Sequence, residues 1–242
     1  MTEEPYRWLE AIGNRREYIR DQLKGGTPVF AFSRPEGILL LGIGQGYSKV
    51  FEIYDRHAFA ALGHPVDIEK IRQAAIEAAH MEGFNRSAKD VTLRRLISFA
   101  LSATLKNSFE QIFSPPIMVE AIFAELGENS GDDVLVRVHY DGNHSYETSG
   151  ALLAHSDPKR EEEAGAWLRQ NIKPSDSLAK VASACLTAWQ ALMEEKPFAD
   201  LTVPKEPVLQ MNGKTVEAAL LDRKSSGPVH YRTLQLNKLK LN

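Results

Sequence analysis

The order of the predicted elements indicates an α+β protein, a four-layer αββα sandwich preceded by an extra N-terminal helix. Strand-like segments form three groups, and the long helices between them come in adjacent pairs instead of alternating singly with strands. Polar turns join neighbouring strands, which suits antiparallel sheets and argues against a doubly wound parallel sheet. We expect a single domain over residues 1–242, with a mobile tail at 1–6, a helix at 7–24, the sandwich at 25–236 and a loose tail at 237–242.

The first helix is predicted from an apolar stripe at helical spacing. Its members are Trp8, Ile12, Ile19 and Leu23. Glutamates early and arginines late in the segment suit the helix dipole, and the pair Gly25 and Gly26 ends it. Because this helix precedes the first strand and has no place inside a sheet, we expect it to pack against the body or against a neighbouring subunit. The stripe residues are therefore candidates for a subunit interface.

Four strands follow the helix. They are predicted at residues 29–33, 37–42, 49–54 and 57–63. The turn at residues 34–37 contains proline and glycine, and a small, glycine-rich connection at residues 42–48 leads to the third strand. A phosphate-binding loop needs a helix after its glycines. Since a strand follows here, we do not expect a nucleotide at this connection.

The rest of the chain repeats the pattern of paired helices and grouped strands. Helices are predicted from Pro65 to about Gly83, from Asp90 to Ser114, and at residues 158–172 and 175–195. Strands are predicted at residues 117–126, 134–138, 144–148, 216–221 and 229–236.

Composition limits the classes of function. The 242 residues carry a formal net charge of −3, which argues against a nucleic-acid partner held by bulk electrostatics. No apolar run is long enough to span a membrane, and the acidic N-terminus lacks the apolar core of a signal peptide. We therefore expect a cytoplasmic protein that needs no cofactor. The single cysteine, Cys185, lies among alanines in a helical pattern and is interpreted as a small core residue.

No motif of a metal or serine hydrolase is present, and one threonine remains as a plausible nucleophile. The seven histidines lack the spacing of metal ligands. Thr27 could react only if the bond from Gly26 were cut, because an N-terminal threonine uses its own α-amino group as base. Lys49 could supply positive charge beside it, but Ile43 occupies the position of the orienting acid. Pro28 also restricts the Thr27 backbone. A threonine at the start of a strand is the favoured interpretation.

Lys49 has a second possible role. A lysine at the mouth of a pocket between subunits pairs well with the C-terminal carboxylate of a partner, since its ammonium is a compact charge with three donors. A plain surface lysine is the alternative.

Four segments resemble 20S proteasome subunits, most closely the α-type subunits of the bacterial, actinobacterial-like branch. They are the helix at 8–24, residues 37–42 (GILLLG) with 49–63 (KVFEIYDRHAFAALG), residues 82–96 (EGFNRSAKDVTLRRL), and residues 216–223 (VEAALLDR) with 229–234 (VHYRTL). The resemblance covers residues 8–232 and rests on the order and spacing of these segments.

The resemblance implies an Ntn-hydrolase-type sandwich without hydrolase chemistry. Family α subunits form seven-membered rings that cap rings of proteolytic β-type subunits, and their N-terminal helix packs ring neighbours together. It also implies a ring-shaped ATPase activator that delivers protein substrates and docks a carboxylate on Lys49. The tails that close the axial pore map onto Met1, Thr2, Glu3, Glu4, Pro5 and Tyr6. The Tyr-Asp-Arg and Phe-Ser-Pro motifs of archaeal and eukaryotic tails are absent, so the details of gating do not carry over.

Three interpretations stay open. The favoured one is a non-catalytic α-ring subunit that serves assembly, gating and activator docking. The second is a self-processed threonine peptidase with Thr27 as nucleophile and Lys49 beside it. The third is a self-associating sandwich with neither gate nor protease.

Overall fold

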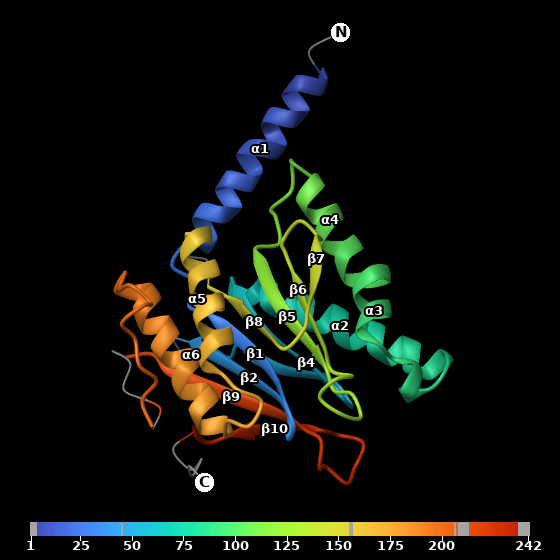
Figure 1. Ribbon diagram of the computed structural model, residues 1–242. Helices are drawn as coiled ribbons and strands as arrows, with labels where there is room; N and C mark the ends of the chain where they lie inside the picture. Colours follow the sequence, from blue (N-terminus) through green and yellow to red (C-terminus); the bar gives the residue numbers. More distant parts are fainter. Residues whose placement is uncertain (1–3, 45, 155–156, 206, 208–212, 237–242) are drawn as a thin grey trace.

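The computed structural model describes residues 4–44, 46–154, 157–205, 207 and 213–236. Figure 1 shows two stacked sheets with helices on both outer sides and α1 projecting from one end. The helices are α1 (Glu4–Leu23), α2 (Pro65–Asn85), α3 (Leu93–Leu96), α4 (Ser102–Glu110), α5 (Pro158–Asn171) and α6 (Leu178–Met193). A π-helical segment, Ile97–Leu101, connects α3 and α4 without a break. The predicted αββα sandwich with an extra N-terminal helix is confirmed.

Within the described residues, two antiparallel sheets have five strands each. The first has the order β10-β9-β2-β1-β8 and consists of β1 (Val29–Arg34), β2 (Gly37–Gly44), β8 (Gly150–Leu153), β9 (Thr215–Asp222) and β10 (Tyr231–Leu234). The second has the order β3-β4-β5-β6-β7 and consists of β3 (Val50–Tyr54), β4 (His57–Gly63), β5 (Val119–Glu125), β6 (Val134–Val138) and β7 (His144–Glu147). Strands from three regions of the chain thus meet in the first sheet.

Both faces of the central strands are buried, which explains their near-continuous apolar sequence. Successive side chains of a strand point to opposite faces. In β1, Phe30 packs beneath α5 and α6, whereas Ala31 lies between the two sheets. A third apolar layer joins the second sheet to α2 and α3, where the rings of Phe59 and Phe123 stack with centroids 5.2 Å apart. Three apolar layers therefore hold the four structural layers together.

Helix α1 is attached to the sandwich by its last turns and by one arginine. Ile19 is 0% exposed and Leu23 is 3% exposed, and both pack in the layer between the sheets. Nearer the N-terminus, Arg15 donates from Nη2 to the main-chain oxygens of Ser108 and Ser114, each at 2.8 Å. These carbonyls lie at the end of α4 and in the loop that follows, where helical partners are missing. The first half of α1 extends beyond the sandwich (Figure 1).

A buried ion pair joins three turns at the far end of β1. The Asp133 side chain is 0% exposed and accepts from Arg223 Nη2 at 2.8 and 3.1 Å. Arg223 also donates to the main-chain oxygens of Arg34 and Pro35 in the β1–β2 turn. The hydroxyl of Ser33 donates to Asp133 at 2.6 Å. The cluster thus connects the β1–β2 turn, the β5–β6 loop and the β9–β10 turn.

Strand β8 is not predicted from the sequence. Its four residues, Gly150–Leu153, lie between the predicted strand at 144–148 and the helix predicted from residue 158. A segment this short and beginning with glycine shows no measurable period. It becomes a strand because β1, distant in the chain, offers an antiparallel partner.

The third helical region also differs from its prediction. It begins at Leu93 instead of Asp90, because the carboxylate of Glu125 on β5 accepts the Leu93 N–H at 2.7 Å. A carboxylate near a helix N-terminus satisfies an orphan donor and suits the dipole. The helix then ends at Glu110, ahead of the predicted Ser114.

Replacing Arg223 by methionine should lower the free energy of unfolding by about 3–5 kcal/mol, because it leaves the Asp133 carboxylate buried without its charge partner. Urea unfolding of the isolated chain measures the loss. Lys106→Ala is the matched control, since it breaks an exposed pair with Glu110 and should cost less than about 0.5 kcal/mol. Equal losses in the two variants would contradict the importance of the buried cluster.

Candidate functional site

A buried threonine and a buried lysine meet at the end of the sandwich where α1 leads into β1. Thr27 lies in the short segment between these elements, and Lys49 immediately precedes β3. They are 8% and 2% exposed, respectively. Gly42 leaves space for the lysine, because a Cβ at that position would lie 3.0 Å from Lys49 Cβ and 3.2 Å from Val50 Cγ2. The small residue in β2 thus permits the lysine to enter the interior.

Two short hydrogen bonds join the Lys49 ammonium to Thr27. The Nζ atom donates to the main-chain oxygen of Thr27 at 2.6 Å and to its Oγ1 at 2.7 Å. The Thr27 hydroxyl in turn donates to the main-chain oxygen of Ile43 in β2. Glu217 on β9 lies at the other side of the lysine, where its Oε2 accepts from the Lys49 main-chain nitrogen at 2.8 Å. Four segments converge on this site, and one of them, β9, is distant in sequence from the other three.

The burial has an electrostatic consequence for Lys49. Desolvation lowers the pKa of its ammonium to about 8, since removal from water disfavours the charged form. The negative charge of Glu217 acts in the opposite direction, and the positive charge of Lys214 lowers the pKa further. The interpretation of Lys49 as a plain surface lysine is therefore wrong, because its side chain is inside the protein and hydrogen bonded there.

The site has the contact of a threonine–lysine pair without the groups that would activate it. The Thr27 nitrogen is in a peptide bond with Gly26, whose own N–H donates to the Leu23 oxygen at 3.0 Å. Ile43, the residue at the position of the acid in the catalytic pattern, is 0% exposed and packs with the apolar side chains of α5 and α6, so it offers Lys49 no carboxylate. Within the described part of the chain, the hydrogen bonds of Lys49 Nζ go to Thr27. A nucleophilic threonine needs a free amine as base, so the intact chain uses this pair structurally.

Glu217 is the one member of the site that the sequence analysis did not single out. It lies in the strand segment VEAALLD, where a carboxylate interrupts a run of apolar residues. That interruption is the only local signal. The partner atoms, the main-chain N–H groups of Lys49 and Val50, lie on a different strand and become neighbours only in the folded sheet pair.

The predicted interface stripe of α1 divides into an inner and an outer half. Ile19 and Leu23 pack inside the subunit, so their assignment to a subunit interface is corrected. Ile12 is partly buried against the same layer. Trp8 is 47% exposed and lies on the projecting half of the helix. The stripe is one face of one helix, but only its outer half is available to a partner.

The predicted gate lies only partly within the described residues. Met1, Thr2 and Glu3 lie outside them. Glu4, Pro5 and Tyr6 belong to the first turn of α1 instead of a mobile tail. Proline fits this position because the first helical N–H groups have no intrahelical acceptor.

An open cleft of about 1480 Å³ lies beside the inner half of α1. Its floor includes Phe32, Leu152 and Leu168. The α1 wall contributes Arg16, Arg20 and Lys24, and the α5 side contributes Glu161 and Glu162. His139 in this cleft has its Nδ1 3.0 Å from Glu120 Oε1, and this contact raises the pKa of the imidazole. The cleft thus combines an apolar floor with charged walls.

Within the described residues, no group of three or more His, Cys, Asp and Glu side chains could hold a metal ion. No helix in that part of the chain is long and apolar enough to cross a bilayer. Cys185 is fully buried beneath the first sheet, as the sequence predicts, and burial raises the pKa of its thiol.

Comparison with known proteins gives a consistent set of relatives. The chain is 32% identical to "Proteasome subunit alpha" of Jonesia denitrificans over 216 residues, covering 88% of this chain and 86% of the relative. It is 32% identical to the protein of the same name from Renibacterium salmoninarum, covering 93% and 87%. A third, from Streptomyces scabiei, is 28% identical, covering 88% and 81%. No family model matches the chain.

Between pH 8 and pH 10.5 the free energy of unfolding should rise more steeply with pH in the native chain than in Lys49→Met. In this window the unfolded lysine still binds a proton that the folded one has lost, so the unfolded state binds more protons and stability increases with pH. Below about pH 8 the Lys49 side chain is charged in both the folded and the unfolded state, so the cost of burying its charge does not change with pH. Urea unfolding at several pH values gives the two slopes.

Lys24→Met is the control for this experiment, because the Lys24 side chain is 71% exposed. Its slope should match that of the native chain. If Lys49→Met also matches the native chain, the lysine is not buried as a charge.

Proposed function

This chain belongs to the family of proteasome α subunits, and from that membership we propose that it is a non-catalytic subunit of a bacterial proteasome α ring. One observation carries the proposal. Helix α1 ends at Leu23, the turn at Gly25 and Gly26 joins it to Thr27, and Ile19 and Leu23 pack inside the sandwich. In the uncut chain the Thr27 nitrogen is part of a peptide bond, and the second strand offers Ile43 in place of an orienting acid.

The proposed role fixes the kinds of partner. Copies of this chain form a ring, seven-membered by the family resemblance, and rings of proteasome β-type subunits supply the proteolysis. Protein substrates pass through the ring on their way to degradation, and the assembly works in the cytoplasm. The chain contributes structure and control of entry, with no cofactor.

A self-processed threonine peptidase is the second candidate. The observation in its favour is the 2.7 Å contact from Lys49 Nζ to Thr27 Oγ1, since a cation beside the hydroxyl assists its ionisation. It requires a cut between Gly26 and Thr27, loss of α1, and a carboxylate that accepts from the ammonium of Lys49, since Glu217 accepts from the main-chain N–H instead.

Co-expression with a proteasome β-type subunit should yield a particle of ring-multiple mass that contains this chain uncut at residue 26. Native mass spectrometry measures the particle, and denaturing mass spectrometry measures each chain. A particle of this chain alone, shortened to begin at Thr27, would replace the proposal with the threonine peptidase. A chain that stays monomeric both when expressed alone and when co-expressed with the β-type subunit would exclude either kind of ring.

Gating and docking extend the proposal to the two ends of α1. We assign the gate to residues 1–6, of which Glu4, Pro5 and Tyr6 form the first turn of the projecting half of α1. We assign the carboxylate receptor of an ATPase activator to Lys49, at the other end. Its Nζ already donates twice to Thr27, so one of the three ammonium donors is left for an incoming carboxylate. Lys49 is 2% exposed, so access of the carboxylate to the buried side chain is the demanding step of the assignment.

Peptide hydrolysis by the assembled particle tests both assignments. Deleting residues 2–6 should raise the basal rate of peptide entry, and Lys49→Ala should lower activator affinity while rings still form. Thr27→Val is the control, because it removes the hydroxyl contact but keeps the ammonium and should preserve docking. Equal weakening by Lys49→Ala and Thr27→Val would make Lys49 a structural residue, and an unchanged basal rate after the deletion would remove the gate from this segment.

A further inference from the structure

Glu217 holds the start of β3 from the opposite sheet. Strand β3 pairs with β4 on one side, so some of its main-chain N–H groups lack a neighbouring strand. Glu217 lies on β9 of the first sheet, and its Oε2 accepts from the Lys49 N–H at 2.8 Å and from the Val50 N–H at 3.3 Å. Because buried N–H groups need an acceptor, this carboxylate fixes the point at which the chain enters β3.

The same contact directs the Lys49 side chain into the protein. Gly42 is the register partner of Glu217 in the β2–β9 pair, and a Cβ at Gly42 would lie 3.0 Å from Lys49 Cβ. The carboxylate thus holds the Lys49 main chain next to a residue without a side chain. From there the Nζ atom reaches the two oxygens of Thr27, at 2.6 and 2.7 Å. Glu217 therefore positions the ammonium by fixing the main chain that carries it.

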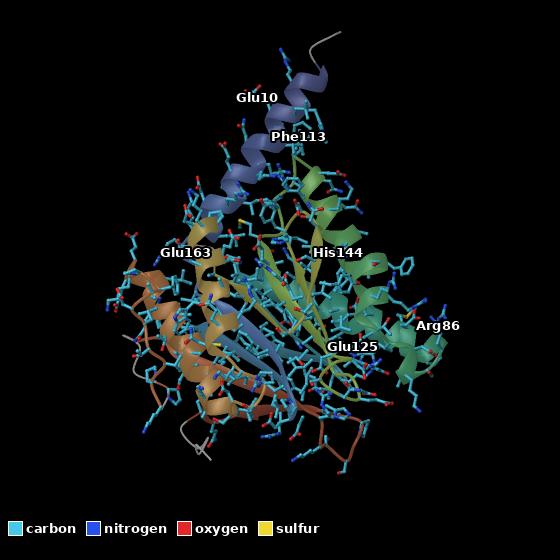
Figure 2. The ribbon with its side chains drawn as sticks, in the orientation of Figure 1. Glu10, Arg86, Phe113, Glu125, His144 and Glu163 are labelled. Carbon is cyan, nitrogen blue, oxygen red and sulfur yellow. The ribbon has the colours of Figure 1, made fainter. Side chains whose placement is uncertain are left out.

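The charge of Glu217 is not neutralised by a direct partner. Glu125 provides a comparison, because its Oε2 also accepts a main-chain N–H, that of Leu93 at 2.7 Å. Figure 2 shows Glu125 in the half of the sandwich away from α1, where Arg56 Nη1 lies 3.0 Å from its other oxygen. In the part of the chain that the structure describes, Glu217 makes no such ion pair. Its negative charge therefore acts on Lys49, where it raises the pKa of the ammonium against the effect of burial.

The other charged groups around Lys49 do not share this effect. The positive charge of Lys214 lowers the pKa of Lys49. Lys24, where α1 ends, has a side chain 71% exposed and paired with an aspartate of its own helix. On β10, burial raises the pKa of Tyr231 to about 12, so its hydroxyl stays neutral in the range where Lys49 titrates. Glu217 is thus the described charge that favours the protonated lysine.

We propose that Glu217 is the positioning residue of the carboxylate receptor, which directs Lys49 into the interior and keeps its ammonium charged for the C-terminal carboxylate of a partner. The inference rests on the proposed docking role of Lys49 and deepens it. A deprotonated amine has no charge to attract an anion, so the receptor works only while the proton is retained. Docking is therefore linked to pH through a residue that need not touch the ligand.

Two substitutions separate the positioning effect from the charge. Glu217→Gln keeps an oxygen acceptor for the two N–H groups and removes the charge, whereas Glu217→Ala removes both. Hydrogen exchange of the Lys49 and Val50 amides, followed by NMR, should be equally slow in the native chain and in Glu217→Gln. In Glu217→Ala it should be about tenfold faster or more, the effect of one hydrogen bond to a charged group. Equal exchange in all three proteins overturns the positioning role.

Urea unfolding measures the effect of the charge. The contribution of Lys49 is the difference between each protein and the same protein carrying Lys49→Met. In the native background this difference should rise above about pH 8, because the unfolded lysine keeps a proton that the folded one loses. In Glu217→Gln the rise should begin at lower pH. Glu52→Gln is the matched control, since Glu52 is a half-buried glutamate on β3 that does not act on Lys49. A native onset in Glu217→Gln overturns the electrostatic role.

Calorimetry on the co-expressed particle connects both effects to docking. The probe is N-acetyl-trialanine with a free carboxylate, and its C-terminal amide is the control. Affinity of the native particle should fall about tenfold between pH 7 and pH 9, as the charged fraction of Lys49 falls. The fall should come at lower pH in Glu217→Gln, and Glu217→Ala should bind more weakly at every pH.

The outcomes distinguish this inference from the proposed docking role. A native particle that binds the carboxylate, with the same pH profile in Glu217→Gln, overturns the role of Glu217 and leaves the docking role of Lys49 standing. A native particle that binds neither peptide overturns the docking role itself, on which the role of Glu217 depends.

Discussion

The packing of Ile19 and Leu23 between the two sheets is the contact on which the rest of the structure depends. Burying an aliphatic side chain of this size contributes about 1.5–3 kcal/mol, and here two of them attach a helix that otherwise has few neighbours. Their packing fixes where α1 ends. Gly25, at φ 84°, then turns the chain towards β1 and places Thr27 over the end of the sandwich. If α1 were attached elsewhere, Thr27 would not cover this end of the sandwich.

The buried lysine follows from the same junction. Lys49 enters the interior because Gly42 has no side chain, and it stays there because Thr27 offers two oxygen acceptors. The strand that could supply an acid offers Ile43 instead. The fold therefore contains a threonine–lysine pair and bears the energetic cost of a desolvated ammonium. In the uncut chain the Thr27 nitrogen is part of a peptide bond, so no α-amino group is available as a base. The pair now ties the α1 junction to the start of β3.

One face of α1 has two physical environments. Its inner residues behave as core, whereas Trp8 reaches solvent because the first half of the helix projects beyond the sandwich (Figure 1). Arg15 marks the transition and joins the helix to the end of α4. A rigid projection with apolar side chains and a charged cleft on the opposite side suit association between copies better than binding of a small molecule. The proposed ring role thus depends largely on the shape of helix α1.

The sequence by itself determined the layer order, because hydrophobic period and grouped helices depend only on residues close in the chain. It also indicated Thr27 and Lys49 as a candidate pair, and comparison with the catalytic pattern placed the missing acid at Ile43. Only the tertiary structure decided that Lys49 is buried, that Glu217 lies beside it and that Ile19 and Leu23 belong to the core. It likewise decided strand β8 and the helix start at Leu93, each of which depends on a partner from a distant strand. Local periodicity shows which side of an element is apolar, but what covers that side depends on segments that become neighbours only when the chain folds.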